Sequence, residues 1–213
     1  GVEHAFFAPG NQDAARAAIG LGRGPVVTYV GRVQSLKGVD LALEMFAELR
    51  TENGVLLIVG GASGTGGDNE VRKLNQRIKE LDLEEQVRLI PPQPHHILST
   101  YYRASDVVVV PSKSESFGLV ALEAAACGTP VVAASVGGLN DLVLHGKTGY
   151  LVNKRDPKLY AHYARQILEN PLHAAEIAMS AVEKAQQYSW QKTSDQILNL
   201  YASVSSRALV DCR

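Results

Sequence analysis

Residues 111–138 read PSKSESFGLVALEAAACGTPVVAASVGG, and the apolar run DVVVV precedes them at 106–110. The apolar run predicts a buried strand, the polar segment after it a loop, and the alanine-rich segment a helix. The run VVAAS at 131–135 predicts the next strand. Glu115 stands in the loop and Glu123 on the helix. Open α/β sheets bind ligands at such a strand–helix turn, so this pair of carboxylates suggests a polyhydroxylated ligand held at two points.

The same alternation of short apolar runs and helical periodicity extends on both sides of this stretch. Short β-branched runs between helices predict a parallel sheet that is covered on both faces. Right-handed crossovers then make it an α/β, Rossmann-like doubly wound sheet with C-terminal helices. Further strands are predicted at 25–31, 55–61, 87–90 and 148–152, and helices at 38–50, 70–81, 97–103, 157–169, 171–188 and 190–205.

The composition is that of an ordinary globular protein, with 213 residues, 46% apolar and 20% charged. The net charge of -1 and the absence of a basic run argue against nucleic-acid binding. Cys127 and Cys212 have neither disulfide-framework nor zinc spacing, so we interpret them as reduced thiols of a cytoplasmic protein. The sequence shows no transmembrane-length run and no signal peptide. It starts without methionine, which suggests a fragment or a processed product.

Two cations lie in the segment GRVQSLKG, residues 31–38, directly after the first predicted strand. Arg32 offers a planar fork of donors and Lys37 a mobile point charge, and both suit phosphate oxygens. The alternative is that they are two solvated surface cations, which is common for these residue types.

The helix that follows the polar loop should present free main-chain N–H groups to an anion. Gly118 would let a ligand approach closely, and the Glu123 carboxylate could accept two hydrogen bonds from a vicinal diol such as ribose. Alternatively, Glu123 is a salt-bridged residue of the helix surface and Glu115 stabilises the helix N-terminus. The N–H groups in question belong to Ser116, Phe117, Gly118 and Leu119.

Three other features of the sequence are weaker evidence for a ligand-binding site. The segment GGASGTGG at 60–67 lacks the Gly-Lys-Ser/Thr ending of a phosphate loop, so we interpret it as a flexible loop near the ligand. His95 and His96 are adjacent, which makes a poor metal pair, and surface or helix-start roles are favoured. The Gly137–Gly138 pair either approaches a ligand through its backbone or makes a turn.

Taken in order, three motifs resemble the C-terminal domain of GT-B fold retaining glycosyltransferases of family 4. The motifs are the GR-x4-K element GRVQSLK at 31–37, the E-x7-E element ESFGLVALE at 115–123, and ACGTPVVAASVGG at 126–138. The opening GVEHAFFAPG is similar to the end of the family's interdomain linker. YSWQKTSDQILNLY at 188–201 is similar to its closing helix, which crosses back towards the N-terminal domain.

The resemblance covers nearly the whole chain and implies its domain organisation. Residues 1–189 would form the nucleotide-sugar donor-binding domain, and residues 190–213 the crossing helix and tail. The N-terminal acceptor domain would be absent from this chain. Within the family, GGASGTGG, PPQ and SESFGLVALEA look most similar to the mycothiol-pathway enzyme that transfers N-acetylglucosamine to inositol phosphate, with sucrose-phosphate synthase a close relative in pattern.

The family's catalytic roles would fall on three residues. Arg32 and Lys37 would hold the donor diphosphate and stabilise its departure, and Glu115 would contact the donor sugar near its O3. These groups could replace a metal, and the sequence has no Asp-x-Asp motif, so no metal or other cofactor is expected.

The donor-binding roles would fall on the neighbouring loops. Glu123 would bind the ribose hydroxyls, and the main chain of Ser116–Leu119 would line the pyrophosphate and sugar. The loop around Gln93 would contact the base through its backbone, and Gly31 would let the donor lie close to the first strand.

The resemblance therefore implies retaining transfer of a sugar from a nucleotide-diphosphate sugar, with UDP the expected nucleotide, to a hydroxyl acceptor. The alternatives are a GT-B nucleotide-sugar epimerase and a non-catalytic nucleotide-binding module. A Rossmann oxidoreductase is disfavoured, because the first strand lacks the glycine fingerprint. Besides the nucleotide sugar, the expected partners are the N-terminal domain, a second copy through apolar residues of 190–205, and a membrane surface only through the missing domain.

Overall fold

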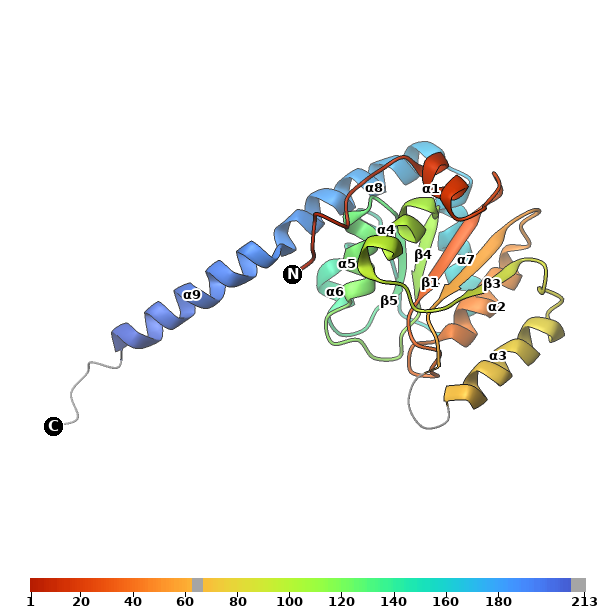
Figure 1. The fold of residues 1–213 in the computed structure, drawn as a ribbon, viewed down its shortest axis with the longest axis horizontal. Helices are drawn as coiled ribbons and strands as arrows, with labels where there is room; N and C mark the ends of the chain where they lie inside the picture. The colour runs from red at the N-terminus through yellow and green to blue at the C-terminus, as the bar shows by residue number, and fades with distance from the viewer. Residues whose placement is uncertain (63–66, 208–213) are drawn as a thin grey trace.

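The computed structural model of the chain describes residues 1–62 and 67–207. Six parallel strands form one sheet in the order β3-β2-β1-β4-β5-β6 (Figure 1). The predicted doubly wound parallel sheet is thereby confirmed. The strands are β1 (Val26–Val30), β2 (Val55–Val59), β3 (Val87–Ile90), β4 (Val107–Val110), β5 (Val131–Ala134) and β6 (Tyr150–Val152).

The helices follow the predicted alternation, with two additions. The additions, α1 (Gln12–Ala18) and α6 (Leu139–Leu142), have seven and four residues, too few for the sequence to show helical periodicity. The other helices are α2 (Val39–Leu49), α3 (Gly67–Glu80), α4 (His95–Ala104), α5 (Leu119–Ala126), α7 (Pro157–Leu168), α8 (Pro171–Ala185) and α9 (Trp190–Arg207), with a 3-10 turn at Gln186–Tyr188.

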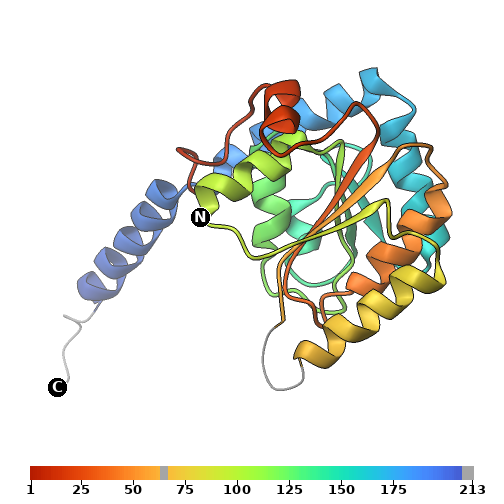
Figure 2. The same ribbon diagram turned by 45° about the vertical axis from the view of Figure 1, so that its right-hand side comes forward.

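Two apolar cores cover the two faces of the sheet, because alternate strand residues point to opposite sides. One core joins the sheet to α2, α3 and α7, and includes Val27 and Val109. The other joins it to α4 and α5, and includes Val26 and Val108. Figure 2 shows helices on both faces of the twisted sheet. Since both faces are buried, the central strand β4 is a continuous apolar run, VVVV.

The strand order reverses between β1 and β4, which pair directly in the middle of the sheet. The loops that leave these two strands therefore lie side by side at the carboxyl edge. Gly38 shows how close they are: it begins α2 with a φ of 74°, and a Cβ there would overlap the carbonyl oxygen of Pro111. Only glycine fits both the left-handed conformation and the lack of space.

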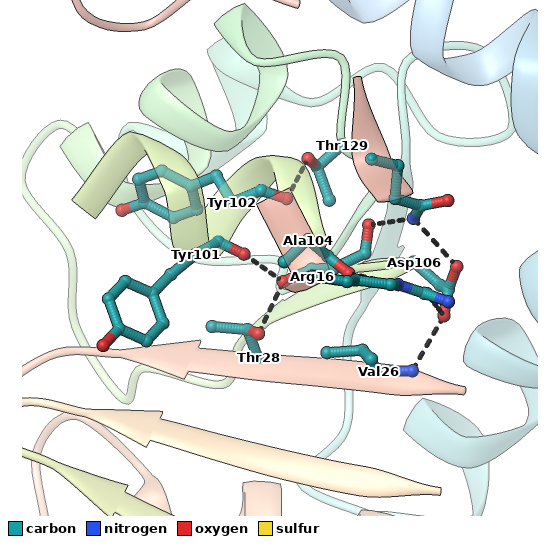
Figure 3. A network of polar contacts seen from close by, with 10 residues as sticks. Arg16, Val26, Thr28, Tyr101, Tyr102, Ala104, Asp106 and Thr129 are labelled. Carbon is teal, nitrogen blue, oxygen red and sulfur yellow. Dashed lines mark hydrogen bonds and ion pairs between the residues drawn. The ribbon is translucent and has the colours of Figure 1, made fainter. Parts of the chain in front are cut away.

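At the opposite, amino-terminal edge, a polar network ties the chain's first helix to the sheet (Figure 3). The guanidinium of Arg16 donates to the carbonyl of Ala104 (2.9 Å) and to Oδ2 of Asp106 (2.7 Å). The same oxygen accepts from the main-chain N–H of Val26, also at 2.7 Å. The network therefore joins α1 to the starts of β1 and β4.

The last helix, α9, leaves the body of the molecule and projects away from it in both views (Figures 1 and 2). Its apolar side chains are exposed, including Leu200 at 60% and Tyr201 at 67%. These side chains therefore do not pack back on this domain. The start of α9 lies beside the start of the chain, since the Val2 N–H donates to the Tyr188 carbonyl at 2.7 Å.

Among the described residues, no helix is both long and apolar enough to cross a membrane. Cys127 is buried, and burial raises the pKa of its thiol to about 12. Cys212 lies outside the described residues, as do residues 63–66 of the GGASGTGG loop.

Candidate functional site

The residues predicted to bind the ligand follow β1, β3 and β4 and lie at the carboxyl edge of the sheet. Parallel strands bring all their carboxyl ends to one edge. The loops after β1 and β4 meet where the strand order reverses, and open α/β sheets bind ligands at that point. The topology therefore brings these segments to one edge of the sheet.

The loop after β1 is anchored to the neighbouring strand ends. The Gly31 N–H donates to the Val59 carbonyl (3.0 Å), and the Val33 N–H donates to the Gly61 carbonyl (3.0 Å). The hydroxyl of Tyr29 donates to the carbonyl of Arg32 at 2.9 Å. The backbone of Arg32 is thus held in place while its side chain is exposed at the sheet edge.

Lys37 and Glu115, which come from the two central loops, form an ion pair. Lys37 Nζ lies 2.7 Å from Glu115 Oε2, and the side chains are 24% and 18% exposed. The loops are also joined by the Lys113 N–H, which donates to the Leu36 carbonyl at 2.9 Å. Lys37 is therefore not a freely solvated cation, and the carboxylate of Glu115 sits beside a fixed positive charge.

The loop that carries Glu115 is held from its other side by the Gly137–Gly138 turn after β5. The Gly138 N–H donates to the Glu115 carbonyl at 3.1 Å. A Cβ at Gly138 would lie 2.6 Å from the Phe117 Cα, closer than real side chains come. Of the two roles the sequence left open for this pair, the structure shows a turn packed against the backbone of 115–117.

Helix α5 begins at this loop, with Gly118 as its N-cap at a φ of 100°. The first N–H groups of a helix have no partner within the helix, so those of Leu119 and Val120 remain available to an anion. The side chain of Phe117 packs edge-on against Tyr188, with ring centroids 6.0 Å apart. The side chains of Ser116 and Leu119 are exposed.

Glu123 lies one turn further along α5 and has a different partner from Glu115. Its Oε2 accepts a hydrogen bond from the hydroxyl of Tyr102 on α4, at 2.8 Å. Burial raises the pKa of the Glu123 carboxyl, while the Tyr102 hydrogen bond and the nearby His95 lower it. Glu123 is thus partly buried and separate from the Lys37–Glu115 pair, and Tyr102 is the partner that sequence analysis missed.

The raised pKa of Glu123 predicts a pH-dependent effect of Glu123→Gln. The folded state favours the protonated form of Glu123. Its contribution to the free energy of unfolding is therefore fully present below about pH 4.3, the pKa of an exposed glutamate. This contribution is lost as the pH rises through the higher pKa of the folded state. We expect Glu123→Gln to raise Tm by about 2 °C at pH 7 and to make no difference at pH 4. Thermal unfolding followed by circular dichroism at both pH values measures this.

A matched control is Glu84→Gln, which removes an exposed carboxylate and should leave Tm unchanged at both pH values. If Glu123→Gln instead lowers Tm at pH 7, burial does not disfavour the ionised form of Glu123.

Gln93 lies in the exit loop of β3, just before α4. Its side-chain amide donates to the Pro91 carbonyl at 2.9 Å, which leaves the backbone of the loop as the surface presented at this edge. His95 is the first residue of α4, and both His95 and His96 are exposed. The helix-start and surface roles predicted for these histidines are confirmed.

A hollow of about 840 Å³ lies away from these residues. It is lined by Pro25, Asp106 and Pro130, which precede β1, β4 and β5, so it opens at the amino-terminal edge of the sheet. The candidate site lies instead at the carboxyl edge. In the part of the chain that the structure describes, no three His, Cys, Asp or Glu side chains gather into a group that could hold a metal ion.

Residues 11–188 match the family model of the glycosyl transferases group 1. The chain belongs to this family. D-inositol 3-phosphate glycosyltransferase of Frankia alni is 43% identical over 99% of the chain and 53% of its own length. The chain thus spans about half the length of the curated relatives it matches. The predicted resemblance is confirmed at the level of group 1 glycosyltransferases, whereas family 4 membership and retention stay predictions.

Two solved structures share the fold closely. Sucrose-phosphate synthase from Thermosynechococcus elongatus superposes with a TM-score of 0.90 at 34% identity, over 97% of this chain and 52% of that one. The Anabaena protein HepE, solved in complex with UDP-glucose, superposes with a TM-score of 0.88 at 28% identity, over 95% of this chain and 56% of that one.

Proposed function

We propose that this chain is the donor-binding domain of a retaining, family 4 glycosyltransferase that moves a sugar from a UDP-sugar to a hydroxyl acceptor. The observation that carries the proposal is the convergence of Arg32, Lys37, Glu115 and the start of α5 where the strand order reverses. Two cations and free N–H groups suit a diphosphate. The family assignment supplies the reaction class.

In the proposed reaction, the bond between the sugar C1 and the diphosphate oxygen breaks, and the diphosphate leaves with the electron pair. The acceptor hydroxyl oxygen then forms a bond to C1 on the face that the diphosphate left, and its proton passes to the departing diphosphate oxygen. Negative charge grows on the leaving oxygens while the sugar becomes oxocarbenium-like. Arg32, Lys37 and the N–H groups at the start of α5 would stabilise that charge with donors already in place. This assignment requires no metal ion or other cofactor.

In this proposal, the carboxylates of Glu115 and Glu123 bind different groups of the donor. Glu115, held by Lys37, would contact the transferred sugar near its O3. Glu123, with one oxygen held by Tyr102, would accept from the ribose hydroxyls. The backbone near Gln93 would contact the base, and Gly31 would allow the donor to approach β1.

The choice of UDP rests on the structural neighbour that was solved with UDP-glucose.

The acceptor would bind to an N-terminal domain in a longer protein, as the relatives of about twice this length suggest. D-inositol 3-phosphate is the first acceptor to test, because the name of a close sequence relative specifies it. Closure of the two domains would exclude water and limit hydrolysis of the donor.

The exposed apolar residues of α9 are consistent with an N-terminal domain that contacts this helix, since the start of α9 and residues 1–2 lie side by side. We propose that they contact the N-terminal domain. A cytoplasmic location, a homodimer and membrane association through the N-terminal domain remain proposals of the same kind.

Isothermal titration calorimetry of the chain with UDP, GDP, ADP and uridine tests the proposal. We expect UDP to bind and uridine, which lacks the diphosphate, to bind at least about tenfold more weakly, because charge-assisted hydrogen bonds to phosphate are lost. Binding of GDP or ADP in place of UDP would correct the base assignment. Failure of all three diphosphates to bind would overturn the proposed function.

A further inference from the structure

The hydrogen bond between Tyr102 and Glu123 joins two neighbouring helices of the same face. Tyr102, on α4, has no exposed surface (0%). Its hydroxyl donates to Glu123 Oε2 at 2.8 Å. Burial, and then the charge of Glu123, raise the pKa of the Tyr102 hydroxyl well above its usual range, so this hydroxyl is a donor throughout the physiological pH range. Glu123 itself is only partly buried.

The tyrosine is fixed at both ends, which makes it a rigid donor. Its main-chain carbonyl accepts from Thr129 Oγ1 at 2.7 Å, as Figure 3 shows. Its ring packs against Phe7, with centroids 5.9 Å apart and planes tilted by 59°. Phe7 is itself buried and also packs on His95 at 5.7 Å. The hydroxyl therefore cannot follow Glu123 if the carboxylate turns.

A glutamate carboxylate rotates broadly about its last torsion angle, and one rigid donor removes that freedom. With Oε2 of Glu123 occupied by Tyr102, the carboxylate plane is set and the lone pairs of Oε1 have fixed directions. A ribose diol needs such fixed directions, because it donates two hydrogen bonds from adjacent carbons. Fixing the acceptor before binding lowers the entropy lost on binding.

We propose that Tyr102 is a positioning residue that orients the Glu123 carboxylate for the ribose diol of the nucleotide, an inference that rests on the donor role proposed for Glu123. Tyr102 does not touch the ligand itself. Its effect should therefore depend on the presence of the ribose hydroxyls and of the Glu123 carboxylate.

The test compares Tyr102→Phe with wild type in calorimetric titrations with UDP and with 2′,3′-dideoxy-UDP, which lacks both hydroxyls. Loss of one hydrogen bond to a charged group corresponds to an increase of about tenfold in the dissociation constant. We expect Tyr102→Phe to weaken UDP binding by about three- to tenfold and to leave dideoxy-UDP binding unchanged. Thermal unfolding of the same samples selects a temperature at which both proteins are folded.

Adding Glu123→Gln separates the possible outcomes. We expect Tyr102→Phe to have little further effect on UDP binding in the Glu123→Gln background, because Tyr102 acts through the carboxylate. Equal weakening of UDP and dideoxy-UDP by Tyr102→Phe would mean a general structural role and would overturn the inference, as would unchanged UDP binding.

The control for packing is Phe7→Leu, which loosens the contact with the Tyr102 ring but keeps its hydroxyl. We expect it to lower Tm while UDP still binds more tightly than dideoxy-UDP. If wild type binds the two nucleotides with equal affinity, and Glu123→Gln changes neither affinity, the ribose role of Glu123 is wrong. The inference about Tyr102 is then wrong as well. If no nucleotide binds, the proposed function fails first.

Discussion

Replacing both Arg32 and Lys37 with alanine is expected to weaken UDP binding by about 100-fold or more and to leave uridine binding unchanged. Each cation would donate charge-assisted hydrogen bonds to the diphosphate. These bonds would contribute about 1.5–3 kcal/mol of binding free energy per cation. Calorimetry on the double variant and on each single variant measures the loss. The slope of affinity against salt concentration should also become shallower.

The structure predicts that the two single variants are unequal. Arg32 is exposed, whereas Lys37 is half-buried and paired with Glu115 at 2.7 Å. Lys37→Ala removes a cation and also leaves the Glu115 carboxylate unpaired, where it would repel the diphosphate. We expect Lys37→Ala to weaken UDP binding more than Arg32→Ala does, and Lys37→Ala/Glu115→Ala to regain part of the loss.

The matched control is Lys113→Ala. Lys113 is an exposed cation in the loop after β4, and its ammonium donates to Ser35 Oγ at 2.8 Å. Its replacement should change UDP affinity by less than about threefold, since exposed charges are well screened. If Lys113→Ala weakens binding as much as Lys37→Ala, the site responds only to net charge and the assignment of Lys37 is wrong.

Asp106→Ala is expected to cause the largest loss of stability, about 3 kcal/mol in the free energy of unfolding. One carboxylate oxygen of Asp106 satisfies both the guanidinium of Arg16 and the N–H of Val26. The Arg16 side chain is only 11% exposed. Removing the carboxylate therefore leaves a mostly buried charge and a backbone donor without their partner. Urea unfolding measures the loss.

Two companion variants test the cause of this loss. Asp106→Asn keeps an acceptor oxygen without its charge and should lie between wild type and Asp106→Ala. Glu80→Ala breaks an exposed ion pair with Arg77 and should leave the free energy of unfolding nearly unchanged. Because Asp106 lies at the amino edge, UDP affinity should be unchanged at temperatures where the variants are folded. A loss below about 1 kcal/mol for Asp106→Ala would contradict the burial argument.

The positions of all six strands followed from the sequence. Buried parallel strands are short apolar runs bounded by loops, and runs such as DVVVV have no competing helical period. Long helices were also predicted, although α3 begins at Gly67, three residues before the expected Glu70. The direction of α9 was not predictable, because its apolar stripe is equally compatible with packing on this domain or on another surface.

The residues of the candidate site were predicted, but most of their partners were not. Arg32, Lys37, Glu115 and Glu123 stood out because charged side chains after buried strands mark the carboxyl edge of an open α/β sheet. Their pairing depends on which loops are neighbours in space. Lys37 and Glu115 are 78 residues apart and meet only because β1 and β4 are adjacent.

Seven residues lie between Glu115 and Glu123. The sequence by itself determined that both stand at one strand–helix turn, because local periodicity sets strand, loop and helix. Only the tertiary structure decided that they differ in environment. Lys37 holds Glu115, and Tyr102 holds Glu123. The physical reason is that a carboxylate's partners and burial come from elements brought together by strand order and helix packing, which local sequence patterns do not encode.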